Sequence, residues 1–344
     1  MTVCGEKKIE DLDIILPHEH IFIDIRNQFT EPVAPNEKKM AYQKVSLNNI
    51  GYLRRDPYLV KDNLILSEYD IARDELMIFK ECGGQSIIDV TPIGIGRDPS
   101  RLRQLMKETG VNIIAGCGFY THDTHTADIE KKSVEDITEI IMNDLEIGMD
   151  HTGVRSGVIG EIGTSQSMHP NEKKVLQAAG RAQFQSKVPL FIHIYPWSKN
   201  GIEVLNILEN EGANLSQVII CHSDVEMDPN YMISVMERGA FIEFDNFGKE
   251  FWIPMNKRGF AGGNFATDRE RVQIIHNFVE LGFQNHLLIT NDICLKAMLH
   301  AYGGWGYDHI LTNVVPMLID VGVEEKIVWE IIKKNPQQLF LNKN

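Results

Sequence analysis

The sequence predicts an α/β protein that folds as a (β/α)8 TIM barrel. Three observations predict this fold. Short apolar runs of strand length show no polar alternation, which is typical of parallel strands buried on both faces. These runs alternate with segments of helical periodicity. The 344 residues show no break in composition, and a single barrel with insertions has this length. A doubly wound open sheet is the alternative.

The expected strands are rich in isoleucine, valine, leucine and phenylalanine, and each is bounded by glycine, proline or polar residues. They cover residues of about 12–17 or 20–24, then 86–90, 111–116, 157–161, 188–193, 217–222, 240–244 and 286–291.

The expected helices follow these strands and begin at recognisable start signals. Ser67 with Asp70, Asp98 before Pro99, and Ser133 with Asp136 combine a capping side chain with an acidic residue or with proline in the first turn. They open helices that end near residues 81, 109 and 145, and further helices are expected at about 171–187, 201–211, 229–238, 268–281 and 323–334.

Residues 24–66 depart from this alternation of strands and helices. The segment mixes prolines and glycine with the basic pair Arg54-Arg55 and predicts a long loop. We expect residues 1–344 to form one barrel domain that carries this insertion over its mouth. There the insertion would form part of a substrate pocket, and a surface insertion without a chemical role is the alternative.

Composition excludes several classes of partner. The formal net charge is −14, whereas nucleic acids and anionic membranes require basic surfaces. No apolar run approaches the roughly 18 residues of a membrane span, and the N-terminus lacks a signal-peptide core. The five cysteines are scattered, which favours neither disulfides nor a thiolate metal cluster. We therefore expect a cytoplasmic protein with a small-molecule substrate.

Residues that can bind a metal or exchange a proton stand where the apolar runs end. His18 and His20 follow the first run, and residues one apart share a face of an extended segment. Later runs end on Glu161, His193, His222, Asp245 and Asp292. The carboxyl ends of barrel strands meet at one face of the fold, where the chemistry of such barrels occurs. The sequence therefore predicts that these side chains gather there.

Four imidazoles, a bridging carboxylate and a terminal carboxylate are a suitable ligand set for two divalent metal ions. Zinc is favoured, and manganese, cobalt or iron would also fit. Such a centre activates water for hydrolysis of an ester-like bond. Asp292 is the candidate for moving the proton. Tyr120, after the third-strand run, is expected to hydrogen-bond the substrate oxygen, and a packed aromatic role is its alternative.

The sequence resembles the phosphotriesterase-related (parathion hydrolase-like) branch of the amidohydrolase superfamily. The resemblance extends over nearly the whole chain. The residues that carry it are Leu16-Pro17-His18-Glu19-His20, Gly160-Glu161-Ile162-Gly163-Thr164-Ser165, His193, His222, Phe244-Asp245-Asn246-Phe247-Gly248-Lys249, Asn291-Asp292, Gly306-Tyr307-Asp308 and Asn335-Pro336.

The resemblance implies a more buried metal on His18, His20 and Asp292 and a more exposed metal on His193 and His222. Many family members bridge the two metals with a carboxylated lysine, whereas this chain has Glu161 at that position. It thus resembles a subset with a bridging glutamate, whose activity should not depend on bicarbonate. A homodimer is suggested by the resemblance alone.

The resemblance leaves the substrate open among organophosphate triesters, acyl-homoserine lactones and phosphorylated sugar lactones. The favoured reaction is opening of a phosphorylated sugar lactone by a metal-bridging hydroxide, and the alternative is phosphotriesterase activity. The expected substrate-binding cations are Lys249, Arg258, Arg271 and Lys199, since a phosphate needs cationic partners. A barrel that binds without catalysis, or a lyase, is a third reading, but no expected strand ends on the lysine that a Schiff-base lyase needs.

Overall fold

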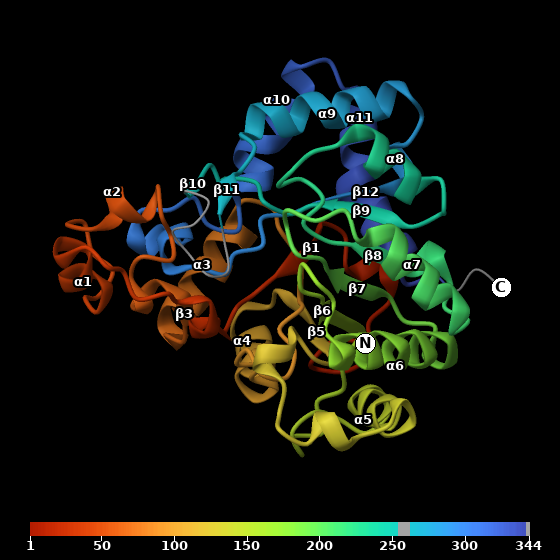
Figure 1. The fold of residues 1–344 in the computed structure, drawn as a ribbon. Helices are drawn as coiled ribbons and strands as arrows, with labels where there is room; N and C mark the ends of the chain where they lie inside the picture. Colours follow the sequence, from red (N-terminus) through yellow and green to blue (C-terminus); the bar gives the residue numbers. More distant parts are fainter. Residues whose placement is uncertain (254–261, 342–344) are drawn as a thin grey trace.

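Eight parallel strands form a nearly closed barrel in the computed structural model, which describes residues 1–253 and 262–341 (Figure 1). Neighbouring strands pair in the order β1-β4-β5-β6-β7-β8-β9-β12. The last strand returns to the first: the Asp292 N–H and the Thr290 hydroxyl both donate to the His18 carbonyl, at 3.3 and 3.1 Å. The predicted (β/α)8 fold is therefore confirmed.

All barrel strands are buried, as their unbroken apolar runs predict. They are β1 (Ile15–Glu19), β4 (Ser86–Asp89), β5 (Asn112–Cys117), β6 (Val158–Gly163), β7 (Leu190–His193), β8 (Val218–Ile220), β9 (Phe241–Phe244) and β12 (Leu287–Ile289). The neighbouring strands pair parallel, with Ile192 of β7 opposite Ile220 of β8. Their carboxyl ends therefore lie at the same end of the barrel.

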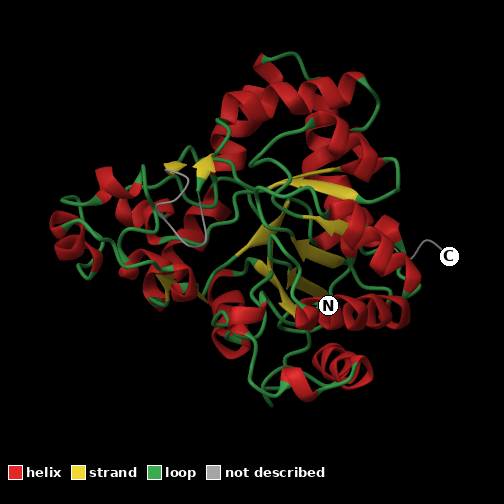
Figure 2. Ribbon diagram, in the orientation of Figure 1, coloured by secondary structure: helices red, strands yellow, loops and turns green. Residues whose placement is uncertain are grey.

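Helices surround the barrel on the outside (Figure 2). They are α3 (Tyr69–Glu81), α4 (Pro99–Thr109), α5 (Val134–Glu146), α6 (Pro170–Ser186), α7 (Gly201–Asn210), α8 (Pro229–Met236) and α9 (Asp268–Glu280). Two predicted start signals cap as expected, since Asp98 accepts from the Arg101 N–H and Ser133 forms a capping box with Asp136. The Ser67 signal is wrong, because the N-cap residue of α3 is Glu68, which makes no side-chain capping bond.

The C-terminal region differs from the predicted single helix at 323–334. It contains α10 (Val315–Asp320), α11 (Glu325–Trp329) and α12 (Asn335–Gln338), with π-helical turns at Ile310–Val314 and Glu330–Lys334. Each π-helical turn ends two residues before a proline, Pro316 or Pro336. Proline cannot donate a hydrogen bond and its ring clashes with the carbonyl four residues earlier, which explains the wider turn.

The segment after β1 is an ordered excursion rather than a featureless loop. Strands β2 (Ile23–Asp24) and β3 (Ile65–Leu66) pair antiparallel at its base, and helices α1 (Pro35–Ala41) and α2 (Ile50–Leu53) project to one side of the barrel (Figure 1). Val45, Leu53, Leu59 and Val60 form a small apolar core with Ala297 from the loop after β12.

None of the helices in the described residues combines the length and the apolar character that crossing a bilayer requires.

Candidate metal centre

The barrel brings the six predicted ligands together at the carboxyl ends of its strands, and all six are buried. His18 lies in β1, with His20 directly after that strand. Glu161 lies in β6, two residues before its end, His193 ends β7, and His222 and Asp292 follow β8 and β12. The six predicted metal ligands that meet in this way are His18, His20, Glu161, His193, His222 and Asp292.

Two of these residues sit on unusual backbone. His222 and Asp292 have φ of 56° and 47°, in the left-handed region that residues other than glycine adopt uncommonly, although aspartate and histidine do so more often than most. The turn is held in place, since the His222 N–H donates to Asp245 at 2.8 Å and the Asp292 N–H donates to the His18 carbonyl. Such conformations persist where surrounding bonds enforce them and are common at functional sites.

Glu161 lies between the imidazoles. One of its oxygens, Oε2, is 3.3 Å from His193 Nδ1, 3.4 Å from His222 Nε2 and 3.6 Å from His18 Nε2. The other, Oε1, is 3.4 Å from His20 Nε2. A carboxylate at this position can supply one oxygen to each of two ions.

Asp292 completes the half of the site formed by β1. Its Oδ1 is 3.2 Å from His20 Nε2 and 3.8 Å from His18 Nε2. Donor atoms of one zinc ion lie roughly 3.4 Å apart, given metal–ligand distances of about 2.1 Å in a tetrahedron. The spacing of this half, and that of Glu161 with its imidazoles, therefore fits metal coordination.

Two buried atoms at the centre support this fit. His18 Nε2 and Glu161 Oε2 have no hydrogen-bond partner in the described structure, although burying an unpaired polar atom is costly. Both atoms face the space between the six side chains, and the donors are the nitrogen and oxygen atoms that zinc and related ions bind. The residues present therefore fit a metal centre, and the chemistry of the donors leaves the identity of the metal open.

The electrostatics of the six residues also suit cation binding. Burial alone would lower the pKa of His20, but its hydrogen bonds with Asp292 and Glu161 raise that pKa to about 10. Burial would raise the pKa of Glu161, but the charge of His18 and the close contacts with His193 and His20 hold it well below its usual value. Without metal, the centre therefore holds protons that a metal ion would displace.

Three outer residues orient the histidines through their second ring nitrogen. Asp245 Oδ1 is 3.1 Å from His222 Nδ1, Glu243 Oε2 is 2.9 Å from His18 Nδ1, and Thr91 Oγ1 is 2.8 Å from His20 Nδ1. Asp245 therefore contacts the candidate ligand His222 on the side of the ring that faces away from Glu161. Sequence reasoning missed Glu243 and Thr91, although a glutamate inside the buried apolar run of β9 was a usable signal.

A cavity opens onto the centre, and residues of the centre itself, among them His20, Glu161 and Asp292, form part of its lining. The barrel loops contribute Tyr120, Trp197, Phe251 and Phe265 to its lining. Tyr120 is buried, and its hydroxyl is 3.2 Å from His193 Nδ1, at the edge of the centre. Its predicted contact with substrate remains a prediction.

The insertion after β1 also reaches this cavity. Ile25, Gln28 and Tyr58 belong to it and line the cavity beside the centre. The structure thus places part of the 24–66 segment where the sequence predicted a pocket wall.

Of the four predicted substrate-binding cations, Lys249 alone among the described residues lines this cavity. It is buried, it contacts Asp292 Oδ2, and its Nζ donates to Asn246 Oδ1 at 3.0 Å. Burial would raise the pKa of Asp292, but the charge of Lys249 and the contact with His20 bring it below its usual value.

The other cations are placed elsewhere. Arg271 is fully buried in ion pairs with Asp224 at 2.7 Å and Asp268 at 3.1 Å, so its prediction as a substrate ligand is corrected to a structural role. Lys199 is half exposed and pairs with Asp228 at 2.7 Å, away from the cavity lining, which is a second correction. Arg258 lies outside the described residues.

Comparisons with known proteins agree with this geometry. Residues 1–340 match the model of the phosphotriesterase family. An N-acetyltaurine hydrolase of Xenopus tropicalis is 34% identical over 339 residues, which is 98% of this chain and 96% of that protein.

Two solved structures resemble the chain throughout. A resiniferatoxin-binding protein from Rhodobacter sphaeroides has a TM-score of 0.95 and 34% identity over 99% of this chain and 94% of its own. A lactonase from Listeria monocytogenes has a TM-score of 0.79 and 26% identity over 100% and 99%. The chain therefore belongs to the phosphotriesterase family, and the protein is a hydrolase that acts on ester or amide bonds.

Proposed function

We propose that the protein is a two-metal hydrolase that cleaves the amide bond of a small N-acyl compound carrying one anionic group, with N-acetyltaurine as the first compound to test. The observation that carries this proposal is Lys249, the one lysine or arginine among the described residues that line the cavity. A single buried ammonium matches the single charge of a sulfonate. The relatives named N-acetyltaurine hydrolase support the same choice.

The ligand geometry assigns each half of the site to one ion. His18, His20 and Asp292 would hold one, His193 and His222 would hold the other, and Glu161 would contact both. When bound, such ions lower the pKa of water towards 7 and polarise a carbonyl oxygen. Zinc is the favoured metal, because imidazole and carboxylate are its usual ligands outside thiolate sites.

The side chains around the metal ligands bind and orient the substrate. The Tyr120 hydroxyl, beside His193, is placed to donate a hydrogen bond to an acyl oxygen at the centre. Lys249 faces the same cavity from the side of Asp292 and would hold the anionic end. Trp197, Phe251 and Phe265 wall the cavity with apolar surface that excludes water. An exclusion of this kind strengthens each charge interaction inside the site.

An amide reaction also needs a proton on the departing nitrogen. Asp292 is the proposed carrier, because it lies between the ligand cluster and the cavity. Lys249 keeps this carboxylate ionised and oriented between turnovers, since the charge of its ammonium lowers the pKa of Asp292.

A phosphorylated sugar lactone is the second candidate. The same lysine favours an anionic substrate, and the Listeria structure is titled a lactonase. A phosphate monoester carries nearly two charges at pH 7, however, and the further cations predicted for it do not line the described cavity. A neutral triester is less suited still, because it offers no anionic group to the ammonium of Lys249, which would then pair with Asp292 alone.

The test measures metal content and hydrolysis on one preparation. We expect about two zinc ions per chain by elemental analysis. We also expect a kcat/KM for N-acetyltaurine at least tenfold above those for neutral N-ethylacetamide, a phosphorylated five-membered sugar lactone and an aryl dialkyl phosphate. A protein with two metals that prefers the lactone or the triester would refute the amide assignment. A protein without metal would refute the two-metal centre itself.

A further inference from the structure

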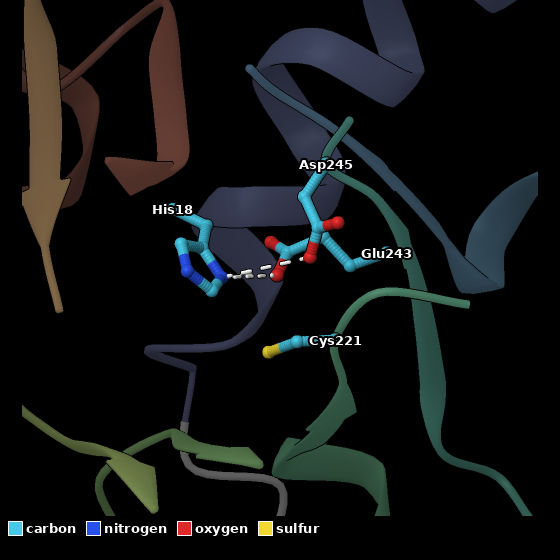
Figure 3. A group of neighbouring side chains, drawn as sticks. All are labelled: His18, Cys221, Glu243 and Asp245. Atoms are coloured by element: carbon cyan, nitrogen blue, oxygen red, sulfur yellow. Dashed lines mark hydrogen bonds and ion pairs between the residues drawn. The ribbon is translucent and has the colours of Figure 1, made fainter. Parts of the chain in front are cut away.

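Strand β9 contributes no predicted metal ligand, yet the strand and the residue after it carry two buried carboxyl groups that lie beside His18 (Figure 3). They belong to Glu243, in the strand, and to Asp245, directly after its last residue. We propose that Glu243 is a positioning residue for the metal held by His18, as Asp245 is for the metal held by His222. This inference rests on the proposed two-metal centre.

The contacts pair each carboxyl group with a different histidine. Glu243 Oε2 is 2.9 Å from His18 Nδ1, which is a direct hydrogen bond, whereas the nearest Asp245 oxygen is 3.7 Å from the same nitrogen. Asp245 is instead engaged with His222, at 3.1 Å through the ring and 2.8 Å through the backbone N–H. Glu243 therefore acts on His18 and Asp245 on His222.

The bond from Glu243 fixes how His18 presents itself to a metal. With Nδ1 engaged, the lone pair of Nε2 points into the centre, where Nε2 lies 3.6 Å from Glu161 and 3.8 Å from Asp292. A carboxylate behind a histidine ligand fixes its tautomer and ring orientation and increases its basicity. Loss of such a partner typically costs about 10- to 100-fold in metal affinity.

Burial argues that Glu243 is more than a packing residue. Its side chain is 0% exposed, deep among apolar strands, and its carboxyl group is hydrogen-bonded to His18 Nδ1. A carboxyl group at such a position costs stability unless charge compensates it. A divalent ion on the far side of His18 would supply that compensation, and it gives the chain a reason to retain a glutamate there.

The same four side chains, His18, Cys221, Glu243 and Asp245, could also be read as a third metal site. Two contacts argue against that reading. The 2.9 Å between Nδ1 and Oε2 is shorter than the roughly 3.4 Å between donors of one zinc ion, and both oxygens of Asp245 are engaged with His222. Cys221 therefore serves as a control, because a third site would need its thiolate whereas the positioning role does not.

The experiment compares Glu243→Leu, Glu243→Gln and Cys221→Ala with the wild-type protein. Each metal-free protein is titrated with Zn²⁺ against a chromophoric chelator that resolves the two binding steps, and its thermal midpoint is measured without metal. We expect Glu243→Leu to weaken one step by 10- to 100-fold and to leave the other within about threefold. The glutamine variant retains an acceptor for Nδ1 and should show a smaller loss. Cys221→Ala should bind two ions like the wild type.

Unchanged affinity in both Glu243 variants would overturn the inference, as would an equal loss in both steps, which indicates general destabilisation. Loss of a bound ion in Cys221→Ala would overturn it in favour of the third site. These results differ from failure of the proposed function, in which the wild-type protein itself would not take up two zinc ions. If the leucine variant does not fold, the isosteric glutamine variant decides, with a loss of at least threefold in one step expected.

Discussion

Replacing Lys249 with methionine keeps most of the length of the side chain but removes the ammonium that faces both the cavity and Asp292. A hydrogen bond to a charged group contributes about 1.5–3 kcal/mol, and about 1.4 kcal/mol corresponds to a factor of ten. Because Lys249 is buried, solvent screens this interaction little. We therefore expect kcat/KM for N-acetyltaurine to fall by about 10- to 100-fold beyond any loss seen with a neutral substrate.

The neutral substrate separates two effects of this substitution. Lys249 also contacts Asp292, so its removal changes the metal centre for every substrate. N-ethylacetamide has the same acyl group without the sulfonate, and it reports only that common effect. The assay is therefore the ratio of the two kcat/KM values on zinc-loaded protein, with Lys199→Met as the matched control, because Lys199 is half exposed and pairs with Asp228. An equal loss on both substrates would show that Lys249 does not bind the anionic group.

Three further predictions test the centre and the fold. Glu161→Ala should reduce the zinc content from about two ions per chain to one or fewer, because Glu161 lies between both sets of imidazoles. An elemental analysis that still finds two zinc ions per chain in this variant would contradict the bridging role of Glu161. Metal affinity should rise with pH from about 6.5 towards 10, because the pKa of about 10 keeps His20 protonated in the metal-free protein and zinc must displace that proton. The measurement is the release of protons when zinc is added at pH 7.5, and the absence of any release would refute the prediction. Arg271→Met should lower the free energy of unfolding by about 3–5 kcal/mol, because it leaves the buried Asp224 carboxylate without the guanidinium that pairs with it. The control Arg269→Met, at an exposed position of the same helix, should change the free energy of unfolding by less than about 0.5 kcal/mol, and urea titrations measure both values.

The sequence predicted which candidate ligands would lie together, because topology determines where the strand ends meet. In parallel strands, residues that follow each strand emerge at the same end, so His193, His222 and Asp292 could be placed together without knowledge of any side-chain contact. Glu243 was missed because its role depends on how far a side chain reaches across the barrel towards His18. The alternation of residues along a strand does not predict how far a side chain reaches across the barrel.

Arg271 shows the opposite limit. Its position in a polar stretch after β9 is equally compatible with a solvated cation, a substrate ligand and a buried ion pair. Asp224, its main partner, is 47 positions away in the sequence and is brought close only by the barrel. The π-helical turns before Pro316 and Pro336 escaped prediction for a local reason, since apolar periodicity continues through them while the hydrogen-bonding pattern changes.

The insertion after β1 is joined to the loop after β12. The Asn63 side chain accepts from the Ala297 N–H at 2.8 Å, Lys296 is buried against Asp62 and Glu68, and Arg54 donates to the Gly303 carbonyl at 2.9 Å.

The two segments therefore form one exchangeable module for anyone who wishes to redesign the specificity of this barrel. A chimaera that replaces the insertion alone would remove Asp62, one of the two carboxylates that pair with the buried Lys296 ammonium, and should lower stability for that reason. Substrate range in such hybrids should then follow the paired exchange of both segments, and natural variation at the two should be coupled for the same reason.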